Sequence, residues 1–296
     1  MDSMVALNRN GIYAALFSPL DSRGELDREK LKALVRFEME HGVEGFYCCG
    51  SSGEGLLLEI EERKAVTEIV AAEACNKVPF IIHTGTLNTR SSIELSSHAK
   101  ASGAAAVSLI PPIYYHYSLD EIEQHYKDVV NAVDIGVIVY NVPHLTGISF
   151  SKKNAFLGDP QIIGIKHTSM NLFDMERIKK AFPEKIVFNG FDEIWLYGLA
   201  AGADASIGTM INIVPKLFKQ IRDGFRSGDI AKAQGLQHEL NDFIEVIADV
   251  GVFPGAKYSM ALQGLDPGSC RKPFAPLNDE NKKRVEKAMK KIEPWL

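Results

Sequence analysis

The chain of 296 residues lacks most features of secreted, membrane-spanning and nucleic-acid-binding proteins. It has four cysteines, whose spacings fit neither a zinc site nor a disulfide framework, so we expect them to be reduced. No apolar run reaches the roughly 18 residues that a membrane span requires. Because the formal net charge is −5 and no Lys/Arg-rich block stands out, nucleic acid is not an expected partner.

Sequence motifs for several common kinds of site are also missing. The histidines form no H-x-H after the first strand-like run and no H-E-x-x-H, which disfavours a metal-dependent hydrolase. The run GSSGEG at 50–55 is neither a dinucleotide fingerprint nor a P-loop. The first twenty residues lack the basic stretch and long apolar core of a signal peptide. We therefore expect a cytoplasmic protein with no membrane partner and no metal.

Short apolar runs alternate with amphipathic segments along most of the chain. Such runs, rich in β-branched residues, are typical of buried strands. The expected strands lie within 11–20, 42–50, 79–85, 105–112, 135–143, 161–169, 185–191 and 203–209.

The segments between these runs have helical periodicity, most clearly at 118–133. There, Ile122, Tyr126 and Val129 fall on one helical face. Ser118 is a plausible N-cap, and Glu121 three residues later completes a capping box. A second helix is expected at 59–75, with acidic residues in its first turn, where the helix dipole favours them.

Eight strand–helix repeats predict an α/β fold of the (βα)8 TIM-barrel type with a C-terminal helical extension. We expect the barrel over residues 1–226, ending in a helix at about 213–226. Residues 227–296 then form a helical appendage packed on the barrel as part of a single structural unit, since no flexible linker separates them. Its expected helices lie at 229–250, 254–263 and 279–292. The alternative is an open, doubly wound sheet.

Active sites of such barrels lie at the carboxyl ends of the strands. Several polar side chains follow the expected strands and would therefore face one mouth. They are Ser51, Ser52, Tyr140, Lys166, Thr168, Asp192, Glu193 and Thr209.

Lys166 ends the apolar run Ile162–Ile165, where a charged amine is costly. It either extends to solvent or serves as a Schiff-base nucleophile. The second interpretation is chemically coherent, because desolvation favours the neutral amine that attacks a carbonyl. Tyr140 ends the neighbouring strand, so its hydroxyl could shuttle protons. It could equally be a core tyrosine bonded to backbone.

Two further groups at this mouth have both a structural and a functional interpretation. The GSSGEG loop offers hydroxyls and backbone N–H groups for an anionic group, although a tight strand-to-helix turn has the same composition. Asp192 and Glu193 are either acids at the start of a helix or acceptors for the hydroxyls of a polyol.

Five motifs, read in chain order, identify a family. GSSGE (50–54), YNVP (140–143), IGIKHTS (163–169), NGFDE (189–193) and AGADASIG (201–208) resemble those of the pyruvate-dependent class I aldolases in the dihydrodipicolinate synthase / N-acetylneuraminate lyase superfamily. The resemblance extends from about residue 10 to RKPFAP at 271–276. It implies a TIM barrel that forms a Schiff base and needs no cofactor beyond this covalent bond on Lys166.

Two positions resemble the lyase branch of this superfamily. The lyases carry Gly-[Phe/Tyr]-Asp-Glu, which stands here as 190–193. The synthases carry an arginine that binds a substrate carboxylate two residues after the proline of YNVP. That position is Leu145 here, and an isobutyl group cannot replace a guanidinium. The resemblance therefore implies reversible cleavage of N-acetylneuraminate to pyruvate and N-acetylmannosamine.

The resemblance also implies a role for each site residue. Lys166 forms the Schiff base and Tyr140 moves the proton of the C4 hydroxyl. Ser51 and Ser52 hold the substrate carboxylate. A tyrosine of the neighbouring subunit, for which we favour Tyr114, enters the site of a homotetramer. The polyol and N-acetyl portion bind Thr168, Gly190, Asp192, Glu193, Gly208 and Thr209.

Other functions stay open at this stage. A sister aldolase or dehydratase acting on another 2-keto sugar acid, or a dihydrodipicolinate synthase, would share most of these residues. A barrel glycosidase would use Glu54 or Glu193 as acid and nucleophile. A catalytically silent protein would bind pyruvate or a sugar without turnover.

Overall fold

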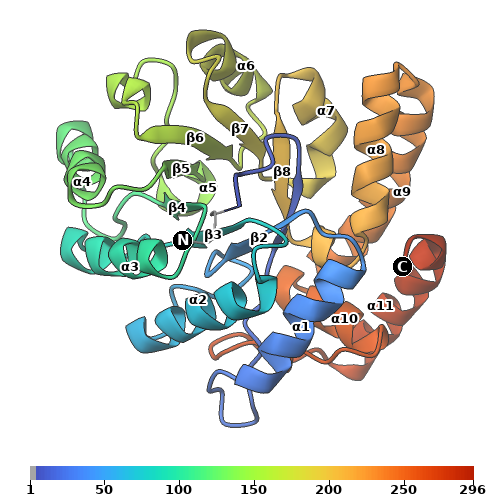
Figure 1. The fold of residues 1–296 in the computed structure, drawn as a ribbon. Coiled ribbons are helices and arrows are strands. Elements are labelled where there is room, and N and C mark those ends of the chain that lie inside the picture. Colours follow the sequence, from blue (N-terminus) through green and yellow to red (C-terminus); the bar gives the residue numbers. More distant parts are fainter. Residues whose placement is uncertain (1–4) are drawn as a thin grey trace.

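The computed structural model describes residues 5–296 and forms a closed barrel of eight parallel strands in chain order (Figure 1). Each strand pairs in parallel with the next along the chain, and β8 pairs with β1. Every expected run contains one strand, so the predicted TIM barrel is confirmed. The strands are β1 Ile12–Ala15, β2 Gly45–Cys48, β3 Phe80–His83, β4 Ala106–Leu109, β5 Val137–Asn141, β6 Ile162–His167, β7 Ile186–Asn189 and β8 Ala205–Gly208.

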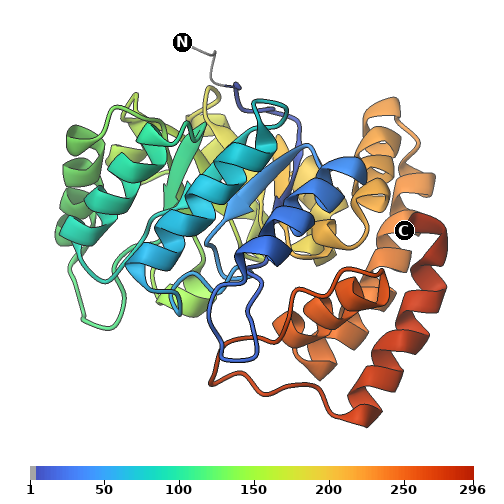
Figure 2. The same ribbon diagram turned by 60° about the horizontal axis from the view of Figure 1, so that its bottom comes forward.

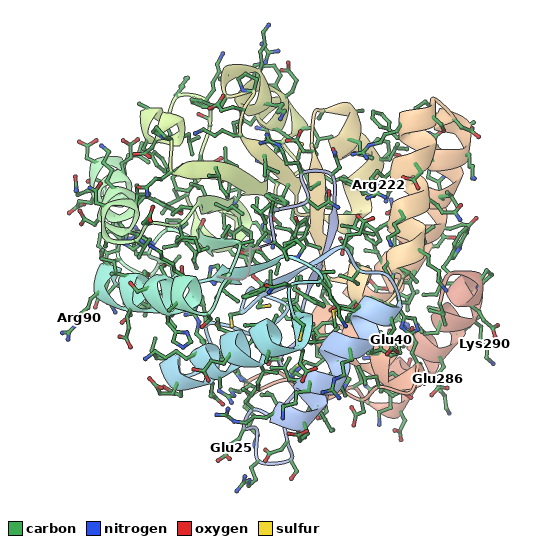
Figure 3. All side chains as sticks on the ribbon, viewed as in Figure 1. Glu25, Glu40, Arg90, Arg222, Glu286 and Lys290 are labelled. Carbon is green, nitrogen blue, oxygen red and sulfur yellow. The ribbon has the colours of Figure 1, made fainter. Side chains whose placement is uncertain are left out.

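A helix follows each strand, and all of these helices except the short α5 form the outer ring that Figure 1 shows around the sheet. Charged side chains such as Glu25, Arg90 and Lys290 project outward from the molecule (Figure 3). Across residues 5–296 no helix has the length and apolar character to cross a membrane. The helices that follow the strands are α1 Arg28–Glu40, α2 Ile60–Ala74, α3 Thr89–Ala101, α4 Leu119–Ala132, α5 Pro143–Thr146, α6 Leu172–Ala181, α7 Trp195–Ala200 and α8 Pro215–Ser227.

The capping signals of two helices can be followed in detail. Ser118 caps α4, and the Glu121 carboxylate accepts a hydrogen bond from the Ser118 N–H at 2.7 Å, so the predicted capping box is present. Glu59 is the first residue of the segment 59–75, for which the sequence predicts a helix with acidic residues in its first turn. It is instead the N-cap, and its backbone N–H donates to the Glu62 carboxylate at 2.8 Å.

The connection from β5 to β6 contains no long helix. It consists of the single turn α5 and a 3₁₀ turn at Ala155–Gly158. Pro143 begins α5 and Gly147 ends it in the left-handed region, with φ of 71°, so the helix stops after one turn. This short connection places His144 and Leu145 of α5 at the barrel mouth.

The C-terminal residues form three helices, α9 Ile230–Val250, α10 Val252–Leu262 and α11 Asp279–Ile292. The α9 helix packs against α8, and α11 packs against α9, so the appendage covers one side of the barrel (Figure 2). A buried glutamine ties it to the barrel mouth. Gln237 accepts a hydrogen bond from the Leu196 N–H at 2.9 Å and donates to the Asp192 carbonyl at 3.1 Å.

Candidate active site

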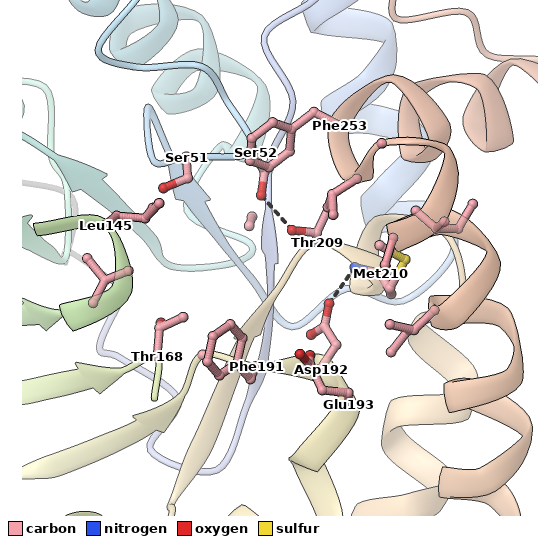
Figure 4. Close-up of a pocket in the computed structure, with 18 of the residues that line it drawn as sticks. Ser51, Ser52, Leu145, Thr168, Phe191, Asp192, Glu193, Thr209, Met210 and Phe253 are labelled. Carbon is pink, nitrogen blue, oxygen red and sulfur yellow. Dashed lines mark hydrogen bonds between the residues drawn. The ribbon is translucent and has the colours of Figure 1, made fainter. Parts of the chain in front are cut away.

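A cavity of about 610 Å³ lies at the carboxyl ends of the strands (Figure 4). Its barrel side contains Ser51, Ser52, Tyr140, Lys166, Thr168, Gly190, Asp192, Glu193 and Thr209. Its other wall is apolar and comes mainly from the C-terminal appendage, through Ile244, Val252, Phe253, Pro254 and Phe274. The polar residues expected at one mouth thus lie around one space.

Lys166 and Tyr140 are direct neighbours across the pairing of β5 with β6. Both side chains are almost fully buried at the floor of the cavity. The Lys166 amine lies 4.0 Å from the centroid of the Tyr140 ring and 4.2 Å from that of the Tyr47 ring. The amine therefore lies at the floor of the cavity with little access to water, where a ligand in the cavity can reach it.

The Tyr140 hydroxyl is set up to exchange a proton. Burial opposes its ionisation, but the positive charge of Lys166 and a hydrogen bond with Ser51 outweigh burial, so the pKa of Tyr140 lies below its usual value. The Tyr140 Oη and Ser51 Oγ atoms are 3.4 Å apart. A phenol with a lowered pKa gives and accepts a proton more readily than an ordinary tyrosine.

The loop after β2 presents two serines to the cavity. The Ser52 and Thr209 hydroxyls lie 2.7 Å apart and link this loop to the end of β8, as the dashed line in Figure 4 shows. The Ser18 hydroxyl donates to the Gly53 carbonyl at 2.7 Å and thereby anchors the loop to the segment that follows β1. Hydroxyl groups held in this way can receive an anionic group without large rearrangement.

Thr168 and Gly190 meet at the end of β6 and β7. A Cβ atom on Gly190 would lie 1.9 Å from the Thr168 Oγ1 atom, so a larger residue at 190 cannot fit without displacing the threonine. The Thr168 hydroxyl is buried and has no hydrogen-bond partner in the protein. A buried unpaired hydroxyl at a cavity is a ready contact for a ligand.

Asp192 is buried at the cavity wall beside β8. Its Oδ2 atom accepts a hydrogen bond from the Met210 N–H at 2.8 Å, whereas its Oδ1 atom has no partner (Figure 4). Burial raises the pKa of Asp192 to about 7, and the neighbouring charge of Glu193 adds to this effect. A Cβ atom on Gly208 would lie 1.8 Å from Oδ1, so Gly208 makes the space that Asp192 occupies.

Glu193 is half-buried beside Asp192. Burial raises its pKa, while the charge of His144 acts in the opposite direction. The His144 ring stacks near Phe191, with ring centroids 5.2 Å apart. The two carboxyl groups and this imidazole give the cavity hydrogen-bonding groups suited to a polyhydroxylated ligand.

Two strand-end histidines are structural. The His167 ring lies 3.1 Å from the Asn171 carbonyl and 3.2 Å from the Asn141 amide. His83 lies 3.1 Å from the Cys49 carbonyl and accepts a hydrogen bond from the Ile110 N–H at 3.3 Å. Within residues 5–296 no cluster of three or more His, Cys, Asp or Glu side chains could hold a metal ion.

Tyr114 does not reach the cavity of its own chain. Its side chain is 85% exposed, on the loop that follows β4. Its φ of 85° lies in the left-handed region, which is unfavourable for an aromatic residue. Its ring packs edge-on against Tyr115, with ring centroids 5.1 Å apart.

The sequence motifs did not reveal two parts of the site. One is Tyr47, the ring beneath Lys166, which looks like any other apolar residue of a buried strand. The other is the wall that Phe253 and Phe274 form, whose rings meet edge-on with centroids 5.6 Å apart. The run GVFPGAK at 251–257 resembles the lyases, but local sequence does not tell which cavity it faces.

The fold and this site define a (βα)8-barrel enzyme with a buried lysine–tyrosine pair at its carboxyl mouth. The chain belongs to the dihydrodipicolinate synthetase family, whose model matches residues 8–292. The family resemblance of the motifs is thereby confirmed.

Curated relatives cover nearly the whole chain. N-acetylneuraminate lyase of Rhizobium meliloti (strain 1021) is 40% identical over 286 residues, which is 96% of this chain and 96% of the relative. N-acetylneuraminate lyase of Salmonella typhimurium is 41% identical over 276 residues, which is 91% of this chain and 92% of the relative.

Solved structures agree with these relatives. CdNal from Clostridium difficile, solved in complex with mannosamine, has a TM-score of 0.94 and 32% identity, covering 96% of this chain and 99% of that chain. A catalytic lysine mutant of Ruminococcus gnavus sialic acid aldolase also has a TM-score of 0.94, with 30% identity, covering 99% of this chain and 100% of that chain.

Proposed function

We propose that the protein is an N-acetylneuraminate lyase, which cleaves the open-chain sugar acid reversibly to pyruvate and N-acetylmannosamine. The observation that carries the proposal is the buried Lys166 amine beside Tyr140, in a cavity whose other polar groups match the two ends of this substrate. The lyases named among its relatives support the same substrate.

Lys166 starts the proposed reaction by adding to the C2 ketone. Loss of water gives a protonated iminium, which accepts the electron pair of the C3–C4 bond as that bond breaks. The products of this step are a neutral enamine and the aldehyde of N-acetylmannosamine. Protonation at C3 restores the iminium, and water then releases pyruvate and the free amine.

Tyr140 is the proton carrier of this proposal. As a phenolate it accepts the proton of the C4 hydroxyl, directly or through the substrate carboxylate, and it returns a proton to C3. Its lowered pKa and its position beside Lys166 support this role. Ser51 and Ser52 hold the carboxylate with hydroxyl and backbone N–H groups.

The polyol end of the substrate would lie against the opposite part of the cavity. Thr168 and Asp192 each have a buried oxygen without a partner, which supports hydrogen bonds to substrate hydroxyl groups. The remaining proposed contacts of the polyol and N-acetyl portion are Gly190, Glu193, Gly208 and Thr209.

Tyr114 is proposed to act in the site of a neighbouring subunit of a homotetramer. A strained and highly exposed tyrosine beside a second exposed tyrosine supports a contact with another copy of the chain. We also propose that the enzyme acts in the cytoplasm.

One of the two carboxylates that a glycosidase would need lies outside the cavity. The Glu54 side chain is 0% exposed and lies 2.6 Å from the Lys257 amine, outside the cavity lining, so it cannot flank a bond together with Glu193. The synthase alternative lacks its arginine, because the cavity contains Leu145 at that position.

Trapping and turnover together test the proposal. The protein is incubated with pyruvate, reduced with borohydride and digested, and the modified peptide is found by mass. We expect one adduct on Lys166; none on this residue would overturn the Schiff-base chemistry. Pyruvate release from N-acetylneuraminate is then compared with release from other 2-keto acids. An adduct without turnover would favour a binding protein, and preference for another acid a sister aldolase.

A further inference from the structure

Two tyrosine rings enclose the Lys166 amine from different strands. The amine lies 4.0 Å from the centroid of the Tyr140 ring on β5 and 4.2 Å from that of the Tyr47 ring on β2. The proposed function assigns a role to Tyr140 but none to Tyr47. Tyr47 is fully buried below the cavity and does not line it, so it has no access to a substrate.

The Tyr47 ring is held in a defined orientation. Its hydroxyl donates to the Ser108 hydroxyl at 3.1 Å, on β4. Its ring meets the Tyr140 ring at 85°, with centroids 6.0 Å apart. The His83 ring lies 5.9 Å from Tyr140 in an edge-on contact and 6.4 Å from Tyr47. These contacts turn the π-face of Tyr47 toward the Lys166 amine.

Two ionisable groups that surround the Lys166 amine within the barrel, His83 and Tyr47, are neutral. Burial, followed by the charges of Arg63 and Lys166, keeps the pKa of His83 well below its usual value, so its ring stays neutral. Burial raises the pKa of Tyr47 well above its usual value, so it faces Lys166 as a neutral phenol. Tyr140 and Asp192 are the ionisable acids that act on Lys166 from the cavity side.

A cation over the face of an aromatic ring is stabilised by the quadrupole of the ring. In the proposed reaction the nitrogen of Lys166 is cationic in the iminium and neutral in the enamine. A ring face directed at this nitrogen therefore stabilises the cationic iminium relative to the neutral enamine and to the neutral amine that adds to the ketone.

We propose that Tyr47 is a positioning residue that stabilises the iminium on Lys166 through the face of its ring. The inference rests on the proposed Schiff-base function. It predicts that the negative potential of the ring at position 47, rather than the hydroxyl group, sets how readily pyruvate forms the iminium.

A fluorinated series at position 47 tests this, because fluorine weakens the quadrupole with little change in ring shape. Tyr47 is replaced by phenylalanine and then by mono-, di- and trifluorophenylalanine. The readout is the pyruvate concentration that gives half-maximal borohydride trapping on Lys166. We expect the pyruvate concentration for half-maximal trapping in Tyr47→Phe to stay within about twofold of the parent value. Across the fluorinated variants this concentration should rise stepwise, by roughly tenfold in total.

The matched control is the same series at Phe46, a buried ring one residue earlier on β2 whose side chain points to the other face of the strand. It should leave half-maximal trapping unchanged. Equal values across the position-47 series would overturn the proposal and make Tyr47 a core residue. This failure can be distinguished from a failure of the proposed function. The proposed function fails if the parent protein shows no adduct on Lys166, whereas the role of Tyr47 fails if the adduct forms but the position-47 series has no effect.

Ser108→Ala provides a second test that keeps the Tyr47 ring. It removes the same hydrogen bond as Tyr47→Phe, so we again expect half-maximal trapping within about twofold of the parent value. If Tyr47→Phe weakened trapping as strongly as trifluorophenylalanine does, the hydroxyl and not the ring face would be responsible, and the proposal would fail.

Discussion

The Lys257 amine lies 2.6 Å from the Glu54 carboxylate, and both side chains are buried. Lys257 belongs to α10 in the C-terminal appendage, whereas Glu54 belongs to the loop after β2 that presents Ser51 and Ser52. The second oxygen of Glu54 accepts a hydrogen bond from the Arg271 N–H at 2.6 Å. The appendage therefore holds the loop that contains both serines.

Lys257→Met should destabilise the protein by about 3–5 kcal/mol, because it leaves the Glu54 carboxylate buried without its cation. Urea unfolding measures the change. The double variant Lys257→Met/Glu54→Gln should recover part of the loss, since no unpaired charge remains. Arg36→Met, which breaks an exposed ion pair with Glu73, is the control and should have little effect. If Lys257→Met and Arg36→Met lowered the free energy of unfolding equally, the buried Glu54–Lys257 pair would not have the role assigned to it.

Tyr140→Phe should lower the turnover of N-acetylneuraminate by about 10²-fold or more, because it removes the proposed proton carrier and keeps the ring. Borohydride trapping of pyruvate on Lys166 should persist. Steady-state kinetics and peptide mass together measure the two effects. Unchanged turnover would remove Tyr140 from the proton pathway.

Gly208→Ala should weaken sugar binding, because the new Cβ atom would displace the Asp192 carboxylate. We expect kcat/KM for N-acetylneuraminate to fall by about tenfold or more, while pyruvate trapping stays near the parent level. Gly235→Ala is the control: its Cβ atom would meet open space on α9, so activity should not change. A Gly208→Ala variant with parental KM would show that Asp192 does not bind the sugar.

The buried Asp192 predicts a specific pH dependence of stability. Its pKa is about 7 in the folded protein against 3.8 as the usual value, so the folded state binds more protons between these limits. The contribution of Asp192 to the free energy of unfolding is therefore favourable below about pH 4. It is lost as the pH rises toward 7, by up to ~4 kcal/mol in total.

The difference in unfolding free energy between the parent and Asp192→Asn isolates this contribution. Urea unfolding at several pH values should show that the difference falls from pH 4 to pH 7 and stays level above that range. A difference that does not vary with pH would mean that Asp192 titrates normally in the folded protein.

Tyr114→Ala should reduce activity if the side chain completes a neighbouring site, although it is far from the cavity of its own chain. Mixing Tyr114→Ala subunits with inactive Lys166→Ala subunits should give more activity than the two variants show separately. The mixed sites combine an intact Lys166 with an intact Tyr114 from the other subunit. Mixtures that gain no activity after subunit exchange has been verified would contradict the shared site.

Much of the fold follows from short stretches of sequence. The alternation of apolar runs and amphipathic segments determined eight strands and the capped helix α4, because burial periodicity and capping depend on residues within a few positions of one another. The polar ends of the strands also determined the cavity residues, since the carboxyl ends of parallel strands in a barrel meet at one mouth.

Tertiary structure decided what lies next to these residues. Whether Tyr47 points into the barrel or outward depends on the register and closure of the sheet, and its distance to Lys166 depends on strands that are more than a hundred positions apart. The apolar wall from Phe253 and Phe274, and the pairing of Glu54 with Lys257, arise in the same way. Local sequence predicts an element and its faces, whereas the packing of distant elements decides which faces meet.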